Sequence, residues 1–331
     1  MSTLFEAGGW GEQRQRWAGP CRGAGVEKGE AREEGRREMT DIIGDIEEFR
    51  EARAEMEGRV AFVPTMGALH EGHLSLMEEG LERADNLVVS IFVNPTQFGP
   101  DADFDDYPRE LDRDRQKCQE VGVDLIFAPT REVIYEEDHS TTVAVEGLVD
   151  VLCGPERPGH FEGVTTIVTK LFNVVEPDVA VFGQKDYQQL AIIRRMVRDL
   201  NMPVEIVGGE TVRESDGLAV SSRNRYLEEQ ERIDARALSE GLARAWESYQ
   251  QGEREAETLV GEVRQRLLES VDPEAIDYVE CVDPTRLNRW VETEGLIDGE
   301  EGAVVAVAVQ VGEARLIDNL RLDGSLPDEL G

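Results

Sequence analysis

The stretch VAFVPTMGALHEGHLSL, residues 60–76, decides the fold of this chain. It opens on four apolar residues, 60–63, a run short enough to be a buried strand. Pro64 and Gly67 interrupt the run and predict a turn. Apolar residues then recur at helical spacing, so we expect a helix that begins near His70. The sequence therefore predicts a strand, a tight turn and a helix in immediate succession.

The N-terminal end of that helix is a ready site for an anion. First-turn N–H groups have no partner inside a helix, and the helix dipole adds partial positive charge there. His70 and His73 stand three residues apart, so both imidazoles lie on one face of the first turn. A phosphate chain across this end would meet backbone donors and two side-chain donors together.

Two other interpretations of the histidine pair stay open from the residues alone. Zinc peptidases place two histidines four apart with a glutamate between them. Here the spacing is three and no third ligand is evident, so a zinc site is disfavoured. A structural pair is the second alternative, but the chain has only four histidines and two of them occupy this one helix start.

Composition limits the class of protein. The chain has 331 residues, enough for two domains, and 40% of them are hydrophobic. No apolar run approaches the roughly 20 residues that cross a bilayer, and no signal-peptide core is present, so we expect no membrane partner and a cytoplasmic location. A net charge of −35 argues against nucleic-acid binding. The four cysteines are scattered and predict reduced thiols.

The acidity itself suggests a second hypothesis. The chain has only four lysines among 35 basic residues, against 70 acidic ones. An acidic, lysine-poor protein of the halophilic type works in concentrated salt, where self-repulsion is screened. The alternative is an ordinary acidic surface on a soluble protein.

Three regions are predicted along the chain. Residues 1–38 carry seven bases and seven glutamates with no sustained periodicity, and we expect a disordered extension. A targeting peptide is the alternative. If translation starts at Met39, residues 1–38 are not part of the protein. Residues 39–211 form the first domain and residues 212–331 a smaller C-terminal one.

Apolar runs and helical periodicities alternate in the first domain, which predicts an α/β fold with a parallel sheet. The expected strands are 60–63, 86–93, 123–127, 179–182 and 204–207, with a short one at 141–145, and the expected helices include 40–57, 165–175 and 187–201. In the C-terminal domain the sequence predicts helices at 228–250 and 255–270, followed by an antiparallel sheet. The expected strands of this α+β domain are 276–282, 303–311 and 314–320.

Polar residues follow several of the predicted parallel strands, and ligands bind beyond the carboxyl ends of such strands. The loop 94–98 follows one strand, and Lys185 follows another. A compact ammonium at this edge would neutralise developing phosphate charge, although a solvated surface lysine is the alternative.

Other polar segments are weaker indications. The loop with Ser221, Ser222 and Arg223 suits phosphate, and Asp112 and Asp114 offer oxygen ligands for Mg²⁺, although most acids here belong to the solvated surface. His160 in a Gly/Pro-rich loop is either a lid residue or simply exposed.

Six blocks in order resemble one family: PTMGALHEGHLSL, VSIFVNPTQFGP, YPRELDRD, CGPERPGHFEGVTTIV, VFGQKDYQQL and VRESDGLAVSSRNRYL. Together they are similar to pantoate–β-alanine ligases (pantothenate synthetases), and the resemblance runs from about residue 39 to 320. It implies a Rossmann-like, nucleotidylyltransferase-type domain with a smaller domain that closes over ATP. It also implies an ATP-dependent condensation of (R)-pantoate with β-alanine through a pantoyl-adenylate, and a homodimer.

The resemblance also assigns roles to residues. His73 matches the family's proton donor, and His70 and Lys185 join it as catalytic candidates. Gln97 matches a contact of both pantoate and β-alanine, and Gln189 a second pantoate contact. Asp114 matches a position associated with Mg²⁺. The ATP contacts that the resemblance implies are Met66, Gly67, Ala68, Leu69, His70, Glu71, Gly72, His73, Gly183, Gln184, Lys185, Asp186, Val212, Val220, Ser221, Ser222 and Arg223.

Two residues depart from the family pattern. Val220 stands where methionine is usual and Gln184 where glutamate is common, and both substitutions are compatible with backbone contacts to ATP. Two rival functions stay open. One is another adenylyl- or cytidylyltransferase with the same HxGH motif, and the other is a nucleotide-binding regulatory module without activity.

Overall fold

The computed structural model describes residues 40–98, 104, 107–292, 295–297, 302–327 and 330. The chain divides into two compact units, Met1–Glu38 and Met39–Gly331. The predicted disordered extension 1–38 lies outside the described residues. Among the helices that the structure describes, none is long and apolar enough to cross a membrane.

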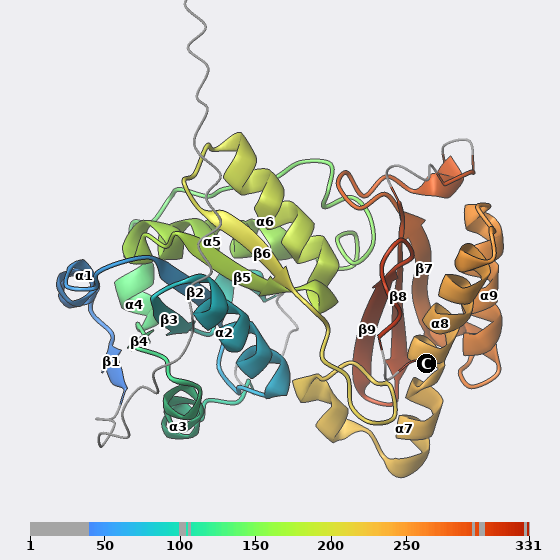
Figure 1. Ribbon diagram of the computed structural model, residues 1–331, viewed down its shortest axis with the longest axis horizontal. Helices are drawn as coiled ribbons and strands as arrows, with labels where there is room; N and C mark the ends of the chain where they lie inside the picture. The colour runs from blue at the N-terminus through green and yellow to red at the C-terminus, as the bar shows by residue number, and fades with distance from the viewer. Residues whose placement is uncertain are drawn as a thin grey trace, which may run out of the picture. The chain divides into compact units, whose positions relative to one another are not determined.

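A six-stranded parallel sheet carries the first part of the second unit (Figure 1). Its order is β1-β4-β3-β2-β5-β6, so the chain builds outward in opposite directions from β2. The crevice beyond β2 and β5 is therefore the topological switch point, where such sheets bind ligands. The strands are β1 (Asp41–Ile43), β2 (Val60–Thr65), β3 (Asn86–Ile91), β4 (Leu125–Phe127), β5 (Val179–Gly183) and β6 (Glu205–Gly209).

Helices cover both faces of this sheet, which explains why its central strands β2, β3 and β5 are largely apolar and buried. Phe62 packs with residues of α1 (Ile46–Ala54), α5 (His160–Val175) and α6 (Tyr187–Asp199). The neighbouring Val63 points to the opposite face, with residues of α2 (Glu71–Arg83) and α3 (Leu111–Val121). The single turn α4 (Arg131–Ile134) follows β4.

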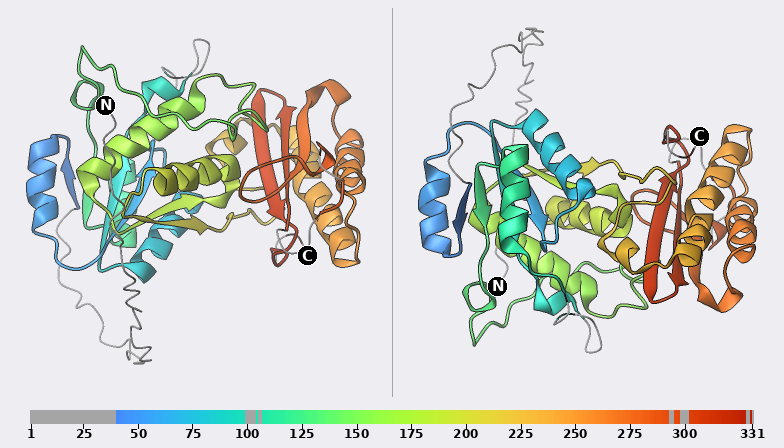
Figure 2. Two further views of the ribbon diagram at one scale, coloured as in Figure 1. Left: turned by 90° about the horizontal axis from the view of Figure 1, so that it is seen from above. Right: turned by 90° about the horizontal axis from the view of Figure 1, so that it is seen from below.

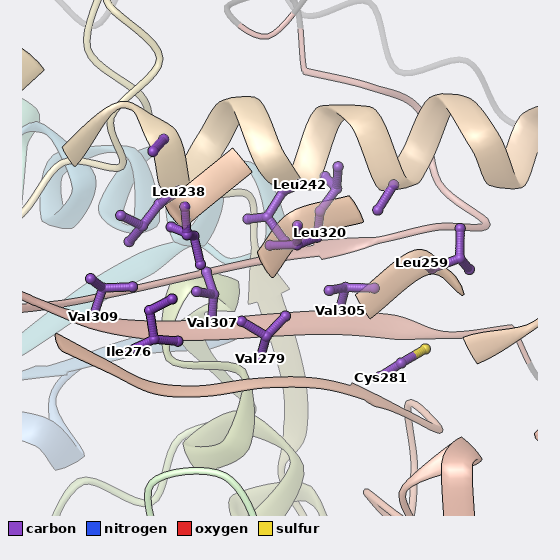
Figure 3. Packing of buried hydrophobic residues seen from close by; sticks show 14 of the residues in the cluster. Leu238, Leu242, Leu259, Ile276, Val279, Cys281, Val305, Val307, Val309 and Leu320 are labelled. Atoms are coloured by element: carbon purple, nitrogen blue, oxygen red, sulfur yellow. The ribbon is translucent and has the colours of Figure 1, made fainter. Parts of the chain in front are cut away.

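A smaller antiparallel sheet, β7-β8-β9, forms the C-terminal part. Leu238 and Leu242 pack onto Val305 and Val307 from the helical side (Figure 3). On the other face, Val304 and Ala306 join a cluster with residues of α5 and α6. The elements are α7 (Glu229–Ala235), α8 (Ala237–Gln250), α9 (Ala256–Leu268), β7 (Ile276–Val282), β8 (Val304–Val311) and β9 (Ala314–Arg321); Figure 2 shows the helices against the sheet.

The predicted fold class is confirmed: a Rossmann-like parallel sheet precedes a smaller domain with an antiparallel sheet. The boundary between residues 211 and 212 stays a prediction, because Met39–Gly331 forms one compact unit.

Three local predictions were wrong. Residues 40–57 hold β1 as well as a helix, because residues 41–43 complete the sheet beside β4. The expected strand at 141–145 is irregular: the N–H of Val143 donates to Thr166 Oγ1, and Thr165 Oγ1 donates to its carbonyl, so α5 side chains replace a partner strand. The predicted helix 228–250 is two helices, α7 and α8.

Candidate active site

A cavity of about 700 Å³ opens at the switch point of the parallel sheet. The loops after β2, β3, β5 and β6 supply much of its wall, and residues of β9 supply another part. Elements far apart in sequence therefore meet around one space.

Most of the residues singled out from the sequence line this cavity. They are Met66, Ala68, His70, Gly72, His73, Gln97, Gly183, Lys185, Asp186, Gln189, Val212, Val220, Ser221, Ser222 and Arg223. Six others do not line it: Gly67, Leu69, Glu71, Gln184, Asp112 and Asp114. Leu69 is buried in the core beside α2, Glu71 is exposed, and the Gln184 amide donates to the carbonyl of Gly208 (3.0 Å).

The two imidazoles stack at the start of α2, with ring centroids 4.1 Å apart. The N–H of His70 donates to Nδ1 of His73 (3.3 Å), which leaves the ring proton of neutral His73 on Nε2. Nδ1 of His70 is buried and has no hydrogen-bond partner among the described residues. Because both histidines line the cavity, the pair can contact a ligand there, but not through this buried nitrogen.

Burial keeps both imidazoles neutral at pH 7. Desolvation is the largest of the effects that lower the pKa of His73 to about 3, and the neighbouring His70, Lys117 and Lys185 contribute the rest of that shift. Desolvation, followed by the charge of Lys185, lowers the pKa of His70 to about 4. At neutral pH these side chains are hydrogen-bonding groups rather than cations.

The turn before α2 has a strained backbone and is held by hydrogen bonds to side chains of α3. Gly67 and Ala68 both have positive φ, +87° and +52°, and alanine rarely adopts this conformation. The carboxylate of Asp114, on α3, accepts from the N–H groups of Ala68 (2.9 Å) and Leu69 (2.8 Å). Lys117, one turn further along α3, donates to the carbonyl of Leu69. These contacts fix the turn that presents the histidines.

The geometry of Asp114 does not fit the Mg²⁺ position that the resemblance implies. Its side chain is 2% exposed, does not line the cavity, and has one amide donor on each oxygen. Asp112 is exposed and also lies off the cavity. Among the described residues, no group of three or more His, Cys, Asp or Glu side chains could hold a metal ion.

Gln97 is held in place by two neighbours. Its amide nitrogen donates to Sδ of Met66 (2.9 Å), and its amide oxygen accepts from Asn94 (3.2 Å). Nδ1 of His160 hydrogen-bonds to the carbonyl of Gln97 (2.8 Å), and His160 is only 9% exposed. The alternative that His160 is simply exposed was therefore wrong: it lines the cavity and supports the Gln97 turn. It also begins α5 rather than lying in the predicted loop, because the helix starts five residues earlier than expected.

Lys185 follows β5 in a 3₁₀ turn and lines the cavity together with the histidines. Its ammonium makes no hydrogen bond or ion pair with any residue in the described part of the chain. The effect of its charge on both histidines indicates that the three groups are close. The ammonium is therefore available to a ligand.

The loop that follows β6 is fixed by a buried ion pair. Arg213 donates to both carboxylate oxygens of Asp318 on β9, at 2.7 and 2.9 Å, and also to the carbonyl of Gly217. The N–H of Val220 donates to the carbonyl of Val212 (2.9 Å), which closes the loop into a hairpin. The next residues, Ser221 to Arg223, then face the cavity.

Sequence reasoning missed several residues of this site. Arg157 lines the cavity, and Asp318 and Asn319 hold its loops; Asn94 also lines it, and the sequence placed its loop at this edge without giving the residue a role. The position of Asn94 directly after a predicted strand was a usable signal. Nothing local distinguishes Asp318 or Asn319 from other polar residues of an alternating strand.

The residues and their geometry agree with comparisons to known proteins. A family model described as pantoate-beta-alanine ligase matches residues 41–321. The chain belongs to the pantoate-beta-alanine ligase family. It is 53% identical to the pantothenate synthetase of Syntrophotalea carbinolica over 282 residues, which cover 84% of this chain and 97% of the relative. It is 52% identical to that of Heliobacterium modesticaldum, over 83% of this chain and 98% of the relative.

Solved structures of the ligase family have the same fold. Pantothenate synthetase from Thermus thermophilus superposes with a TM-score of 0.78 at 46% identity, covering 85% of this chain and 99% of that one. The pantoate-beta-alanine ligase of Francisella tularensis, complexed with beta-gamma ATP and beta-alanine, gives a TM-score of 0.67 at 28% identity, covering 86% and 99%.

Proposed function

We propose that this ligase condenses (R)-pantoate with β-alanine, using ATP and releasing AMP and diphosphate, through a pantoyl-adenylate held in the cavity at the switch point. The observation that carries the proposal is the convergence of His70, His73 and Lys185 with the Ser221–Arg223 loop around one space of about 700 Å³. Family membership supports the same reaction.

The first step activates a poor acyl donor. A pantoate carboxylate oxygen attacks the α-phosphorus of ATP, the bond from that phosphorus to the bridging oxygen breaks, and diphosphate leaves with the electron pair. The phosphate oxygens gain charge as this happens. Lys185, Ser221, Ser222 and Arg223 offer donors for that charge. Neutral His73 donates a hydrogen bond from Nε2 rather than acting as a cation.

In the second step the free amine of β-alanine attacks the pantoyl carbonyl. The amide C–N bond forms, the bond from the carbonyl carbon to the AMP oxygen breaks, AMP leaves with the electron pair, and the amine proton passes to water or to the phosphate of the released AMP. Gln97 is the candidate contact for both small substrates, with Gln189 a second contact for pantoate. Water competes with the amine, so enclosure of the intermediate by the loops protects it.

Mg²⁺ enters this proposal as part of the MgATP substrate. Protein-bound Mg²⁺ usually keeps waters and substrate phosphate oxygens as ligands. The proposal uses no metal site at Asp114, because that carboxylate holds the turn before α2. We also keep two expectations as proposals: a homodimer, which the family resemblance suggests and sedimentation tests, and a cytoplasmic location, which the sequence features suggest and cell fractionation tests.

Pantoate-dependent exchange of labelled diphosphate into ATP tests the first step without β-alanine. The proposal expects exchange only when pantoate is present, and pantothenate with equimolar AMP once β-alanine is added. Exchange without pantoate, or driven by phosphopantetheine, would instead support a different adenylyltransferase. Absence of AMP release with all substrates present would favour a regulatory nucleotide-binding module.

A further inference from the structure

The edge strand β9 contacts two loops of the cavity through two consecutive residues. Asn319 donates its amide hydrogens to the carbonyl oxygens of Gln184 (3.0 Å) and Lys185 (2.8 Å). Asp318, the preceding residue, forms the buried ion pair with Arg213 at the base of the other loop. Successive side chains of a strand point to opposite faces, so one dipeptide holds the two loops from both faces of the strand.

The contact to the first loop has a fixed chemistry. Two backbone carbonyls can only accept hydrogen bonds, so the group that faces them must be the NH₂ of Asn319 rather than its carbonyl. Asn319 is 7% exposed, and its own N–H donates to Asp318 (2.8 Å). The backbone of Lys185 is thereby fixed by the C-terminal sheet, although Lys185 lies in the turn that follows β5 of the parallel sheet.

We propose that Asn319 is a positioning residue of the ligase reaction, and that the Asp318-Asn319 pair sets the distance between the Lys185 ammonium and the Ser221–Arg223 loop. Neither side chain needs to touch the reacting atoms for this role. A shift of about 1 Å in a catalytic group can cost on the order of 100-fold in rate. The inference rests on the proposed role of Lys185 in the adenylation step.

Two variants of Asn319 separate its hydrogen bonds from its packing. Asn319→Asp has nearly the same shape but turns a carboxylate toward two carbonyl oxygens, whereas Asn319→Ala removes the side chain. Both are expected to lower kcat for pantoate-dependent exchange by about 10- to 100-fold, with the KM for pantoate unchanged. In both variants the two loops are held less firmly, so water can reach the pantoyl-adenylate. Hydrolysis of this intermediate releases AMP without pantothenate, so AMP formation should exceed pantothenate formation.

Tyr187→Phe is the matched control. The hydroxyl of Tyr187 donates to the carbonyl of Pro284 (3.1 Å), which also links α6 to the C-terminal part, but it does not contact the carbonyls beside Lys185. This variant should keep wild-type kcat and a one-to-one ratio of AMP to pantothenate. Melting temperatures of all variants report any general loss of stability.

A double-mutant cycle with Lys185→Ala decides the mechanism. If Asn319 acts by placing Lys185, the Asn319 substitution costs little further activity once the ammonium is gone. An undiminished cost in that background, or an Asn319→Asp variant with wild-type kcat and product ratio, would overturn the proposal. Failure of the proposed function is distinguishable, because it would appear as absent pantoate-dependent exchange in the unmodified enzyme.

Discussion

Replacement of Asp114 by alanine tests whether this carboxylate supports a turn or binds Mg²⁺. The substitution leaves the N–H groups of Ala68 and Leu69 without their acceptor. The N–H of Leu69 is buried and that of Ala68 is partly buried. An unsatisfied buried donor costs about 1–3 kcal/mol, so the two together cost at most about 2–6 kcal/mol. Burial raises the pKa of Asp114 despite the opposing bonds from Leu69 and Ala68, so removal of the charge returns part of that cost. We expect a net destabilisation of about 2–4 kcal/mol.

The assay is urea unfolding without nucleotide and with EDTA present, followed by initial rates over a range of Mg²⁺ concentrations. Asp114→Asn should lose less stability, because its amide oxygen keeps one acceptor and no charge is buried. Asp112→Ala is the matched control, since that residue lies in the same helical turn but is exposed.

A metal ligand would behave differently. Its removal would leave stability in EDTA unchanged, and excess Mg²⁺ would restore activity. That pair of results for Asp114→Ala would refute the structural interpretation given above.

Three further predictions concern the site and the surface. Lys185→Ala should lower turnover about 100-fold with the fold intact, which is the scale of one lost transition-state donor. The control Lys170→Ala should keep the wild-type turnover, because Lys170 lies off the cavity. Equal turnover in the two variants would remove Lys185 from the site. The pKa values of His70 and His73 are lower in the folded protein than in the unfolded chain, so the unfolded chain binds protons first as the pH falls. The free energy of unfolding should therefore decrease as the pH drops from about 6.5 towards 4 and 3. Urea titrations of a variant with both histidines replaced by asparagine should show a weaker dependence of this free energy on pH. The net charge of −35 predicts a higher melting temperature in molar KCl than in dilute buffer; identical melting curves would count against the halophilic hypothesis.

The sequence alone determined most strands of the parallel sheet and the sheet edge that carries the chemistry, although it missed β1 and predicted a strand at 141–145 that is irregular. Apolar runs bounded by glycine and proline located the strands from β2 to β6, because strands covered on both faces are mostly apolar; the edge strand β6 still begins at the exposed Glu205. The chain order of strand, turn and helix placed His70, His73 and Lys185 at one edge, since parallel strands share their carboxyl ends. Local chemistry was sufficient for these conclusions.

Only the tertiary structure decided which residues act on the reactants and which support them. Asp114 resembled a metal ligand in sequence, but α3 packs behind the α2 turn and directs the carboxylate to two amides. Asn319 was one polar residue of an alternating strand until the fold brought it to the carbonyl of Lys185, 134 positions away. Contacts of such sequence separation depend on how whole sheets and helices pack, and no local pattern of residues encodes them.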